Sequence, residues 1–305
     1  MSDLRDVLIT GGTGFIGGHL CHLLRARGYR ITILTRNPQE HLAGASEDVR
    51  FVSSFDQLEA QTKWYGVINL AGEPLSAGRW NPARKNIYRA SRIELTQRLN
   101  QWICSLEHSP AVLLSGSAVG WYGHWQDESL DETSDSHGGY AHQLCSDWES
   151  AAIEQLPPQT RLVLVRIGIV LGADGGPLPE MLAPAKLGLG GPMGSGRQWW
   201  SWIHIYDLTR LLLFLLETDD VSGPVNATAP NPVTQREFAS LLGVVLNRPA
   251  FLPLPAFIAE LALGEFAREI LLNGQRVFPV VAQSCGFSFK YPELGPALSD
   301  ILACD

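Results

Sequence analysis

Three glycines near the start of the chain, Gly11, Gly14 and Gly17, have a spacing that implies anion binding. A short β-rich apolar run at residues 7–10 precedes them, and residues 15–27 have the pattern of a helix. In such a unit the first glycine permits the bend, the second lets the main chain approach a pyrophosphate, and the third lets helix and strand pack closely. The free N–H groups and partial positive charge of the helix N-terminus would complete the site.

The end of a second strand, expected at residues 30–34, indicates which cofactor this loop would hold. The loop has the spacing Gly-x-x-Gly-x-x-Gly, and the flanking strands favour a dinucleotide site over a glycine-rich turn without a ligand. Thr35-Arg36-Asn37 follows the strand and offers no carboxylate to a ribose 2′-hydroxyl, whereas a 2′-phosphate needs a cation. Arg36 lies 22 positions after Gly14, near the interval of about 20 in such sites. We therefore predict NADP(H), with a solvated surface arginine as the alternative.

Composition predicts a cytoplasmic protein that acts on a small molecule. The net charge of −8, without a lysine-rich tract, argues against nucleic acid as a partner. Hydrophobic residues make up 45% of the 305 residues, but no run approaches the ~20 that a membrane helix needs, and residues 1–6 are too short and polar for a signal peptide. Five scattered cysteines without metal-like spacing indicate reduced thiols and no metal site: Cys21, Cys104, Cys145, Cys285 and Cys304.

Strand and helix patterns alternate along the first half of the chain, which predicts a parallel sheet covered by helices on both faces. Asn81-Pro82 would cap a long helix whose apolar stripe includes Ile87 and Leu99. Further strands are expected at 49–53, 66–70, 111–115 and 162–167, and helices at 82–104, 140–155, 208–216, 237–246, 257–272 and 294–302, with a closing strand or turn at 286–289.

After about residue 172 the chain becomes rich in glycine, proline and tryptophan, as expected of a substrate lobe. We predict an α/β, doubly wound parallel-sheet Rossmann fold with a smaller C-terminal α/β substrate lobe. Residues 1–171, completed by about 203–230, would form the NADP-binding domain. Residues 172–202 and 231–305 would form the lobe.

Eight motifs together resemble those of one protein superfamily. They occupy residues 10–17, 69–73, 79–80, 115–123, 166–172, 189–192, 194–198 and 202–207, and the last, a tryptophan-containing block, is the most distinctive. On these motifs the chain resembles atypical extended short-chain dehydrogenases/reductases of the NAD(P)-dependent epimerase/dehydratase superfamily. More narrowly, it is similar to epimerase-family proteins described as nucleoside-diphosphate-sugar epimerases or as homologues of the cell-division inhibitor SulA.

The resemblance implies a set of cofactor contacts. Residues 69–72 match a strand-end motif whose small residues let the ribose and adenine side of the cofactor lie against the backbone. The implied contacts are Gly11, Thr13, Gly14, Phe15, Ile16, Gly17, Thr35, Arg36, Leu70, Ala71 and Gly72.

The resemblance also implies a catalytic hydroxyl. Residues 115–123 match the segment with the superfamily's catalytic Ser or Thr, so Ser117 is expected to hydrogen-bond a substrate oxygen, with Ser115 as the second choice. Ordinary turn formation by these serines is the alternative.

The usual partner of that hydroxyl, a Tyr-x-x-x-Lys pair on one helix, is absent. Such a lysine lowers the pKa of the phenol toward neutrality, which permits proton transfer. Tyr140 is nearly in place, but Leu144 lies four residues on, and a shift by one puts Ala141 and Cys145 at the two positions. No tyrosine lies four residues before any of the lysines, which are Lys63, Lys85, Lys186 and Lys290.

Two functions remain open on this evidence. In the first, the protein is an NADP(H)-dependent oxidoreductase or epimerase-like enzyme in which Ser117 orients the substrate and Tyr140 or Tyr122 donates a proton. Without the lysine, a phenol acts more easily as an acid than as a base. In the second, the protein senses NADP(H) or a metabolite, passes that state to a partner and has no turnover.

Candidate substrate contacts come from both halves of the chain. Arg197 follows a Gly-Ser-Gly turn and could hold a carboxylate or phosphate, whereas Trp200 and Trp202 would form either an apolar wall or core. Asp207 is expected to cap the helix at 208–216. The candidates are Glu73, Arg79, Trp80, Arg197, Trp200, Trp202 and His204. A nucleotide sugar is the superfamily's default substrate, and the helix at 82–104 could pair two copies into a homodimer.

Overall fold

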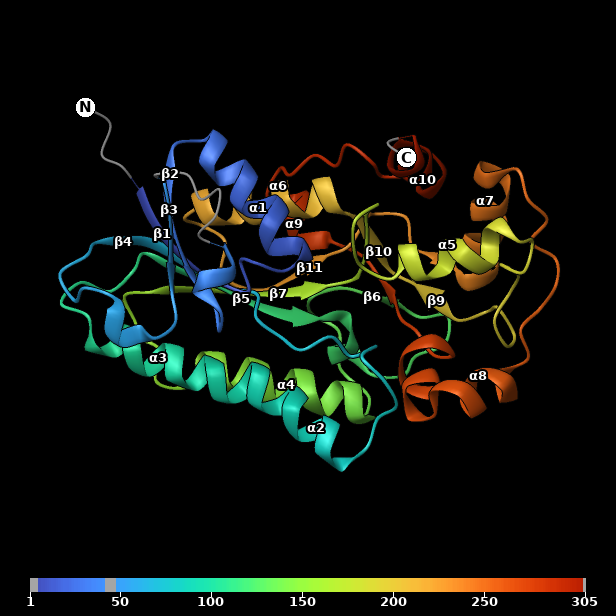
Figure 1. Cartoon of the computed structure of the whole chain (residues 1–305), viewed down its shortest axis with the longest axis horizontal. Helices are drawn as coiled ribbons and strands as arrows, with labels where there is room; N and C mark the ends of the chain where they lie inside the picture. The colour runs from blue at the N-terminus through green and yellow to red at the C-terminus, as the bar shows by residue number, and fades with distance from the viewer. Residues whose placement is uncertain (1–4, 42–47, 304–305) are drawn as a thin grey trace.

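A seven-stranded, entirely parallel sheet forms the centre of the protein in the computed structural model, which describes residues 5–41 and 48–303 (Figure 1). The predicted doubly wound sheet is confirmed. Its order is β11-β7-β5-β4-β1-β2-β3, the Rossmann order with a seventh strand added. The strands are β1 Arg5–Thr10, β2 Tyr29–Leu34, β3 Val49–Val52, β4 Trp64–Asn69, β5 Val112–Ala118, β7 Arg161–Ile167 and β11 Gly223–Ala227.

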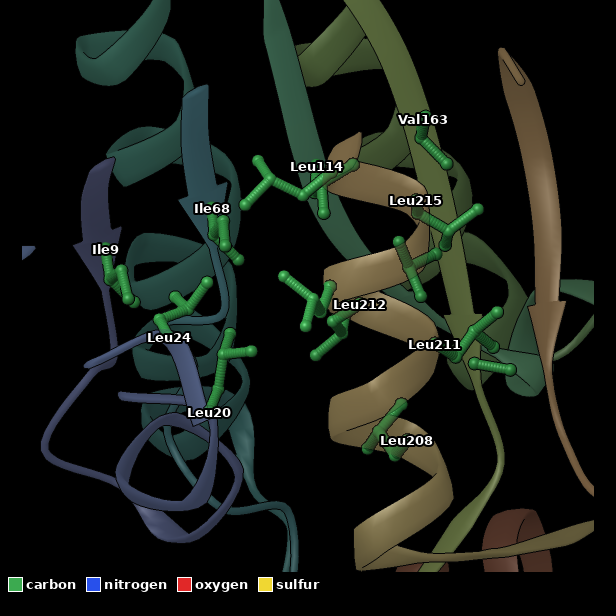
Figure 2. Packing of buried hydrophobic residues seen from close by; sticks show 14 of the residues in the cluster. Ile9, Leu20, Leu24, Ile68, Leu114, Val163, Leu208, Leu211, Leu212 and Leu215 are labelled. Atoms are coloured by element: carbon green, nitrogen blue, oxygen red, sulfur yellow. The ribbon is translucent and has the colours of Figure 1, made fainter. Parts of the chain in front are cut away.

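Helices α1 (Phe15–Ala26) and α6 (Ile205–Glu217) pack together on one face of the sheet. Figure 2 shows Leu20 and Leu24 of α1 and Leu212 of α6 pointing toward Ile68 and Leu114 of the sheet. All five side chains are fully buried. This apolar layer fixes the N-terminus of α1 beside the end of β1, because both elements share one core.

The other face is covered by α4 (Tyr140–Ile153) and by one long helical segment with a π-helical turn. This segment consists of α2 (Pro82–Arg89), the π-turn at Ala90–Glu94 and α3 (Leu95–Ser105). The predicted cap is present, since Asn81 accepts a hydrogen bond from the Arg84 amide. The predicted stripe is wrong before the π-turn: Ile87 is 44% exposed and Tyr88 is buried. A π-turn contains one extra residue, which changes the side chains that face the sheet on the helix before it. A single apolar stripe with a 3.6-residue period therefore cannot continue through the turn.

Helices α5, α7 and α10 pack around a second core, which includes Trp200, Trp202 and Phe238, whereas α9 packs against β11 in the main core. The predicted helix at 257–272 is interrupted, because Gly264 ends α8 with a φ of +63°. Residues 286–289 form no strand. The helices of the C-terminal part are α5 Leu178–Lys186, α7 Gln235–Leu246, α8 Ala256–Leu263, a π-turn Ala267–Leu271, α9 Val280–Ser284 and α10 Leu294–Leu302.

The short strands and 3₁₀ turns complete the described chain. The strands are β6 Ser129–Leu130, β8 Ile169–Leu171, β9 Trp199–Trp200, β10 Trp202–His204, β12 Val233–Thr234 and β13 Arg276–Val277. The 3₁₀ turns are η1 Pro38–His41, η2 Phe55–Gln57 and η4 Val119–Tyr122. Within residues 5–41 and 48–303, no helix has the length and apolar character needed to span a bilayer. Cys304 lies outside the described residues.

Candidate functional site

The glycine loop lies between the end of β1 and the start of α1. Gly11 has a φ of +70°, and its carbonyl accepts a hydrogen bond of 3.0 Å from the Gly14 amide. A Cβ on Gly17 would lie 2.2 Å from the carbonyl oxygen of Gly11, so only glycine lets α1 approach the loop this closely. The expected close packing at Gly17 is therefore present.

The N-terminus of α1 has the character of an anion site. Its N-cap residue, Gly14, is exposed and provides no side-chain hydrogen bond, and the first turn contains no acidic residue. The first N–H groups of a helix have no partner within the helix, and no cap competes for them here. The residues present thus fit a pyrophosphate.

The three other predicted residues of this loop have different surroundings. Thr13 is exposed in the turn, and Ile16 packs against the main core. The ring of Phe15 supports the loop after β8, since a Cβ added to Gly175 would lie 2.4 Å from it. His19, one turn further along α1, contacts Asp174 of that same loop at 3.0 Å. The side chains of Phe15 and Ile16 are thus used in packing, which leaves their backbone N–H groups for a ligand.

Arg36 stands at the edge of the sheet with its side chain exposed. The amide of Thr35 donates to the Val52 carbonyl at 2.9 Å, which fixes the end of β2 against β3. The nearby carboxylate of Glu40 accepts a hydrogen bond from Asn37. Among the described residues, the Arg36 guanidinium makes no hydrogen bond or ion pair, so it is available to an external phosphate.

Residues 70–72 lie directly against the glycine loop. The amide of Leu70 donates to the Thr10 carbonyl at 3.1 Å, and that of Ala71 donates to the Thr10 hydroxyl at 3.3 Å. A Cβ on Gly11 would lie 2.7 Å from the carbonyl carbon of Leu70. The two predicted parts of the cofactor site, from β1 and from β4, are therefore adjacent.

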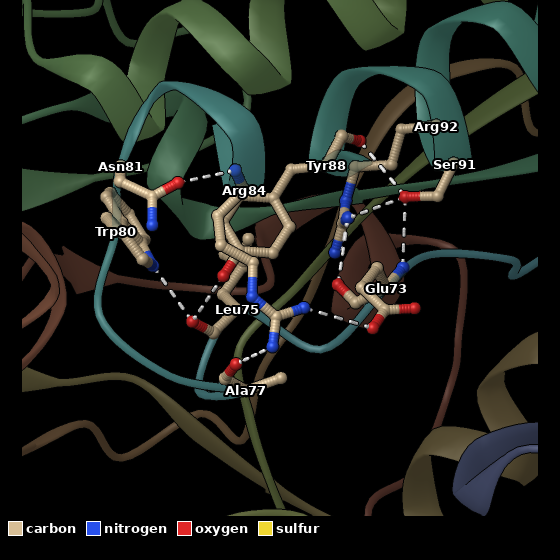
Figure 3. A network of polar contacts seen from close by, with 9 residues as sticks. All are labelled: Glu73, Leu75, Ala77, Trp80, Asn81, Arg84, Tyr88, Ser91 and Arg92. Atoms are coloured by element: carbon tan, nitrogen blue, oxygen red, sulfur yellow. Dashed lines mark hydrogen bonds and ion pairs between the residues drawn. The ribbon is translucent and has the colours of Figure 1, made fainter. Parts of the chain in front are cut away.

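Arg92 is a candidate that the sequence analysis missed. Its guanidinium lies over Gly72, where an added Cβ would be 2.9 Å from it. Figure 3 shows the hydrogen bond of 3.0 Å that it donates to the Glu73 carbonyl. The ring of Trp148 lies 5.3 Å away, and burial lowers the pKa of Arg92. The π-turn carries Arg92 to this place, and no local sequence signal marks it.

Glu73 and Trp80 have partners within the protein. Arg84 pairs with the Glu73 carboxylate at 3.6 Å and also donates to the Ala77 carbonyl (Figure 3). The Trp80 indole donates to the Leu75 carbonyl at 2.9 Å, and its ring is buried. These contacts shape the loop after β4. Arg79 is exposed in the same loop.

Ser117 lies at the end of β5 in a buried polar group. Its hydroxyl donates to Glu149 at 2.7 Å, and Glu149 accepts two hydrogen bonds from Arg166, at 2.9 and 3.0 Å. All three residues are almost fully buried, and the Arg166 guanidinium stacks 3.4 Å above the Trp121 ring. Ser115, the second choice, accepts a long hydrogen bond from Asn69 at 3.5 Å. Ser117 therefore has its proton committed to Glu149 and retains oxygen lone pairs.

The two candidate phenols have unrelated surroundings. The Tyr140 hydroxyl donates to the Lys85 carbonyl at 3.4 Å, and the Lys85 ammonium lies 4.1 Å above its ring. Burial raises the pKa of Tyr140. Tyr122 is fully buried and donates to Asn226 at 2.8 Å, and burial raises its pKa to about 12. Both phenols are neutral at pH 7.

Ala141 and Cys145, at the positions of the missing pair, are covered by η4. A Cβ on Gly120 would lie 3.4 Å from the Ala141 Cβ and 3.6 Å from the Cys145 sulfur. Burial raises the pKa of the Cys145 thiol to about 12, so it carries no charge. The place from which a tyrosine and lysine would project is thus filled by backbone.

The C-terminal candidates divide into one exposed and several buried residues. Arg197 is exposed, and its side chain contacts no polar partner in the described part of the chain. Trp200 packs on Phe238, with ring centroids 4.9 Å apart, and Trp202 is completely buried. Of the two alternatives for these tryptophans, the structure favours core packing.

His204 provides the N-cap of α6, a role that the sequence analysis gave to Asp207. Its Nδ1 accepts from the Tyr206 amide at 3.0 Å, and its ring stacks on Tyr291 at 4.1 Å. Burial lowers the pKa of His204. The fully buried Asp207 instead accepts the amides of Lys290 and Tyr291, at 2.9 and 2.7 Å, because α6 begins three residues earlier than predicted. Residues 5–41 and 48–303 contain no cluster of ligands suited to a metal ion.

Comparison with known proteins shows the family to which the chain is similar. The model of the NAD dependent epimerase/dehydratase family matches residues 7–227, and a domain of unknown function, DUF1731, matches residues 254–301. Epimerase family protein SDR39U1 of Homo sapiens is 39% identical, over 97% of this chain and 99% of its own length. Epimerase family protein YfhF of Bacillus subtilis is 36% identical, over 98% of each chain.

A solved structure of a relative covers the whole fold. The crystal structure of human epimerase family protein SDR39U1 (isoform 2) with NADPH has a TM-score of 0.89 and 37% identity, over 98% of this chain and 99% of that chain. The nucleoside-diphosphate sugar epimerase of Corynebacterium glutamicum has a TM-score of 0.77 and 28% identity, over 99% of this chain and 59% of that chain. The relative with NADPH contains the cofactor that the sequence predicts here.

Proposed function

The chain belongs to the NAD dependent epimerase/dehydratase family, and we propose that it is an NADP(H)-binding, oxidoreductase-like protein that acts on a small molecule. The observation that carries this proposal is the exposed guanidinium of Arg36 at the end of β2, which has no hydrogen-bond or ion-pair partner among residues 5–41 and 48–303. A carboxylate there would repel a 2′-phosphate, whereas a guanidinium binds it with charge-assisted hydrogen bonds. The human relative solved with NADPH supports the same choice.

The proposed contacts follow the geometry of the site. The N-terminus of α1, after Gly14, would hold the pyrophosphate, and Thr35 with Arg36 would hold the 2′-phosphate. Residues 70–72 would lie along the remainder of the dinucleotide, with the Arg92 guanidinium behind them. When bound, the nicotinamide supplies or accepts a hydride.

The chemistry would use the residues of this chain as acids and orienting groups. Since the Ser117 proton is donated to Glu149, its oxygen would accept a hydrogen bond from a substrate hydroxyl or amine. Tyr140, with a raised pKa, would donate a proton rather than remove one. Hydride transfer to a carbonyl needs such a donor for the oxygen, so we assign Tyr140 this role in the reduction of a carbonyl.

We further propose that residues 172–202 and 231–305 form the substrate lobe. Arg197 is the candidate there for a carboxylate or phosphate, since its side chain is exposed. A nucleotide sugar, the superfamily's default, would satisfy this requirement.

Titration calorimetry with NADPH, NADP⁺, NADH and NAD⁺, on protein freed of co-purifying nucleotide, tests the proposal. We expect NADP(H) to bind at least about tenfold more tightly than NAD(H), equivalent to about 1.4 kcal/mol. Absence of binding by all four would overturn it. NADPH oxidation with a panel of carbonyl compounds then tests turnover.

A non-catalytic NADP(H) sensor is the second candidate, because Gly120 covers the positions of the missing Tyr and Lys. NADPH binding without consumption of any carbonyl compound, together with a partner whose capture depends on NADPH, would favour this function. Turnover that is lost in Ser117→Ala would exclude it.

A further inference from the structure

Arg276, on β13, carries a positive charge that no group in the described part of the chain neutralises. Its guanidinium carbon lies 4.4 Å from the centroid of the Trp199 ring and 5.5 Å from that of the Phe278 ring. Within residues 5–41 and 48–303 this guanidinium makes no hydrogen bond or ion pair, and its Nε is buried without a partner. Two aromatic rings thus line a cation whose hydrogen-bond donors are unused.

Hydrogen bonds to two other segments fix the backbone of β13. The Val277 amide donates to the Ser201 hydroxyl at 2.9 Å, and this hydroxyl donates to the Gln275 carbonyl at 2.7 Å. The side-chain amide of Gln275 donates to the Gly123 carbonyl at 2.5 Å. Because the strand is held in this way before a ligand arrives, little backbone entropy would be lost on binding at Arg276.

The same contacts place β13 beyond the carboxyl ends of β5 and β7. Gly123 follows η4, which begins directly after β5. The Ser201 carbonyl accepts a hydrogen bond of 2.8 Å from the Ile169 amide, two residues after β7. Figure 1 shows β6, the partner of β13, and β9 beyond the ends of the arrows of β5 and β7. In sheets of this kind, ligands bind at the carboxyl ends of the strands.

The acidic residue that contacts the Trp199 ring does not pair with Arg276. Asp127 is exposed and accepts a hydrogen bond of 2.9 Å from the indole of Trp199, and it forms no ion pair with Arg276. A guanidinium presents its N–H groups as a planar fork that matches two oxygens of a carboxylate or phosphate. A neutral ligand would satisfy these donors but leave the charge uncompensated, so the site favours an anion.

Trp199 and Arg276 are residues that the sequence analysis missed. It placed the aromatic wall of the substrate lobe at Trp200 and Trp202, which the structure shows to be core, whereas the neighbouring Trp199 is only partly buried. Arg197, a candidate for the same kind of group, lies two residues before Trp199 and adds a second guanidinium to this segment.

We propose that Arg276 binds a carboxylate or phosphate group of the ligand of the substrate lobe, with the Trp199 ring as the wall against which the guanidinium is held. This inference deepens the proposed function, and it rests on that function only for the assignment of residues 231–305 to the substrate lobe. The anion would lie beyond the end of β5, so the remainder of the ligand would extend toward the Ser117 hydroxyl.

Nitrogen–proton correlation spectra of the full chain, titrated with inorganic phosphate or with acetate at constant ionic strength, test this site. The buried Arg276 Nε–H and the Trp199 indole N–H are the two reporters, assigned by their loss in Arg276→Gln and Trp199→Phe. We expect both signals to shift in a saturable way, with a dissociation constant of about 1–10 mM for a small anion. Saturation with NADPH beforehand would occupy the anion sites at α1 and Arg36.

Substitutions around the site should change the affinity in opposite directions. In Arg276→Gln the indole signal should report phosphate binding at least about tenfold weaker, and Arg276→Lys should restore part of it. Asp127→Asn should tighten binding, because it removes a nearby negative charge. Arg248→Gln is the matched control and should bind phosphate as the parent does. Arg248 is exposed, donates to the Lys186 carbonyl and has no carboxylate partner among the described residues.

Absence of a saturable shift up to about 50 mM of either anion would overturn the proposal. Equal affinity in the parent and in Arg276→Gln, shown to be folded by circular dichroism, would also overturn it. Saturation by phosphate but not by acetate would identify a phosphate group, and the reverse result a carboxylate. The titration is repeated without NADPH, so that a failure of NADPH to bind, which would refute the proposed function, leaves the result for Arg276 intact.

Discussion

The hydroxyl of Ser117 donates a 2.7 Å hydrogen bond to Glu149, whose carboxylate also accepts two hydrogen bonds from Arg166. This contact joins the end of β5 to α4 and fixes the direction of the Ser117 proton. A buried carboxylate needs such partners, because desolvation of an unpaired charge costs several kcal/mol. The group therefore has a structural role that can be separated from any role in chemistry.

Glu149→Gln should destabilise the fold much more than Ser117→Ala does. The first change leaves the buried Arg166 charge without its partner and should cost about 3–5 kcal/mol. The second removes one hydrogen bond and should cost about 1 kcal/mol. Urea unfolding followed by circular dichroism measures both free energies. Equal losses would show that the ion pair is not the dominant contact.

Arg36→Ala should weaken NADPH binding and leave NADH binding unchanged. Hydrogen bonds to a charged group contribute about 1.5–3 kcal/mol, which corresponds to roughly a 10- to 150-fold loss of affinity. Arg27→Ala, which removes an exposed arginine at the other end of α1, is the control and should bind NADPH as the parent does. Unchanged NADPH affinity in Arg36→Ala would refute the assignment of the 2′-phosphate contact.

Gly17→Ala should abolish NADPH binding, whereas Gly18→Ala should stabilise the fold. A methyl group on Gly17 would lie 2.2 Å from the Gly11 carbonyl oxygen, so the loop must shift and NADPH binding should be lost. No atom of another described segment lies within 4 Å of a methyl group on Gly18, and alanine there should stabilise α1 by up to about 1 kcal/mol. Thermal unfolding and NADPH titration of both variants check this pair. Normal NADPH affinity in Gly17→Ala would contradict the geometry of the loop.

The free energy of unfolding should fall as the pH drops below about 6.5, the usual pKa of histidine. Burial lowers the pKa of His204, an effect that nearby Asp300 and Asp207 oppose and nearby Lys290 reinforces. The unfolded state then binds a proton that the folded state does not, so stability is retained above this pH and lost below it. In His204→Asn, which can still cap α6, the loss between pH 7.5 and 5.5 should be smaller. Parallel pH profiles for parent and variant would exclude His204 as the cause.

Local sequence patterns were sufficient to predict the sheet and the strand–turn–helix geometry of the glycine loop. The bend at Gly11, the helix after Gly14 and the cation at Arg36 depend on residues that are close in the chain, where steric and hydrogen-bonding preferences act directly. The absence of a Tyr-x-x-x-Lys pair was also readable, because its two positions are four residues apart on one helix. The prediction that Ile87 faces the sheet was wrong, because the π-turn changes which side of α2 is buried. The prediction that Asp207 caps α6 was wrong, because this helix begins earlier.

The sequence by itself therefore determined the fold class, the glycine loop between β1 and α1, and the absence of a Tyr-x-x-x-Lys pair. Only the tertiary structure decided that Ser117 donates to Glu149, that Gly120 fills the space over Ala141, and that Arg92 lies behind Gly72. Each of these contacts joins residues at least 20 positions apart. Their formation depends on how whole helices and loops pack against the sheet, and no local preference of the chain encodes that arrangement.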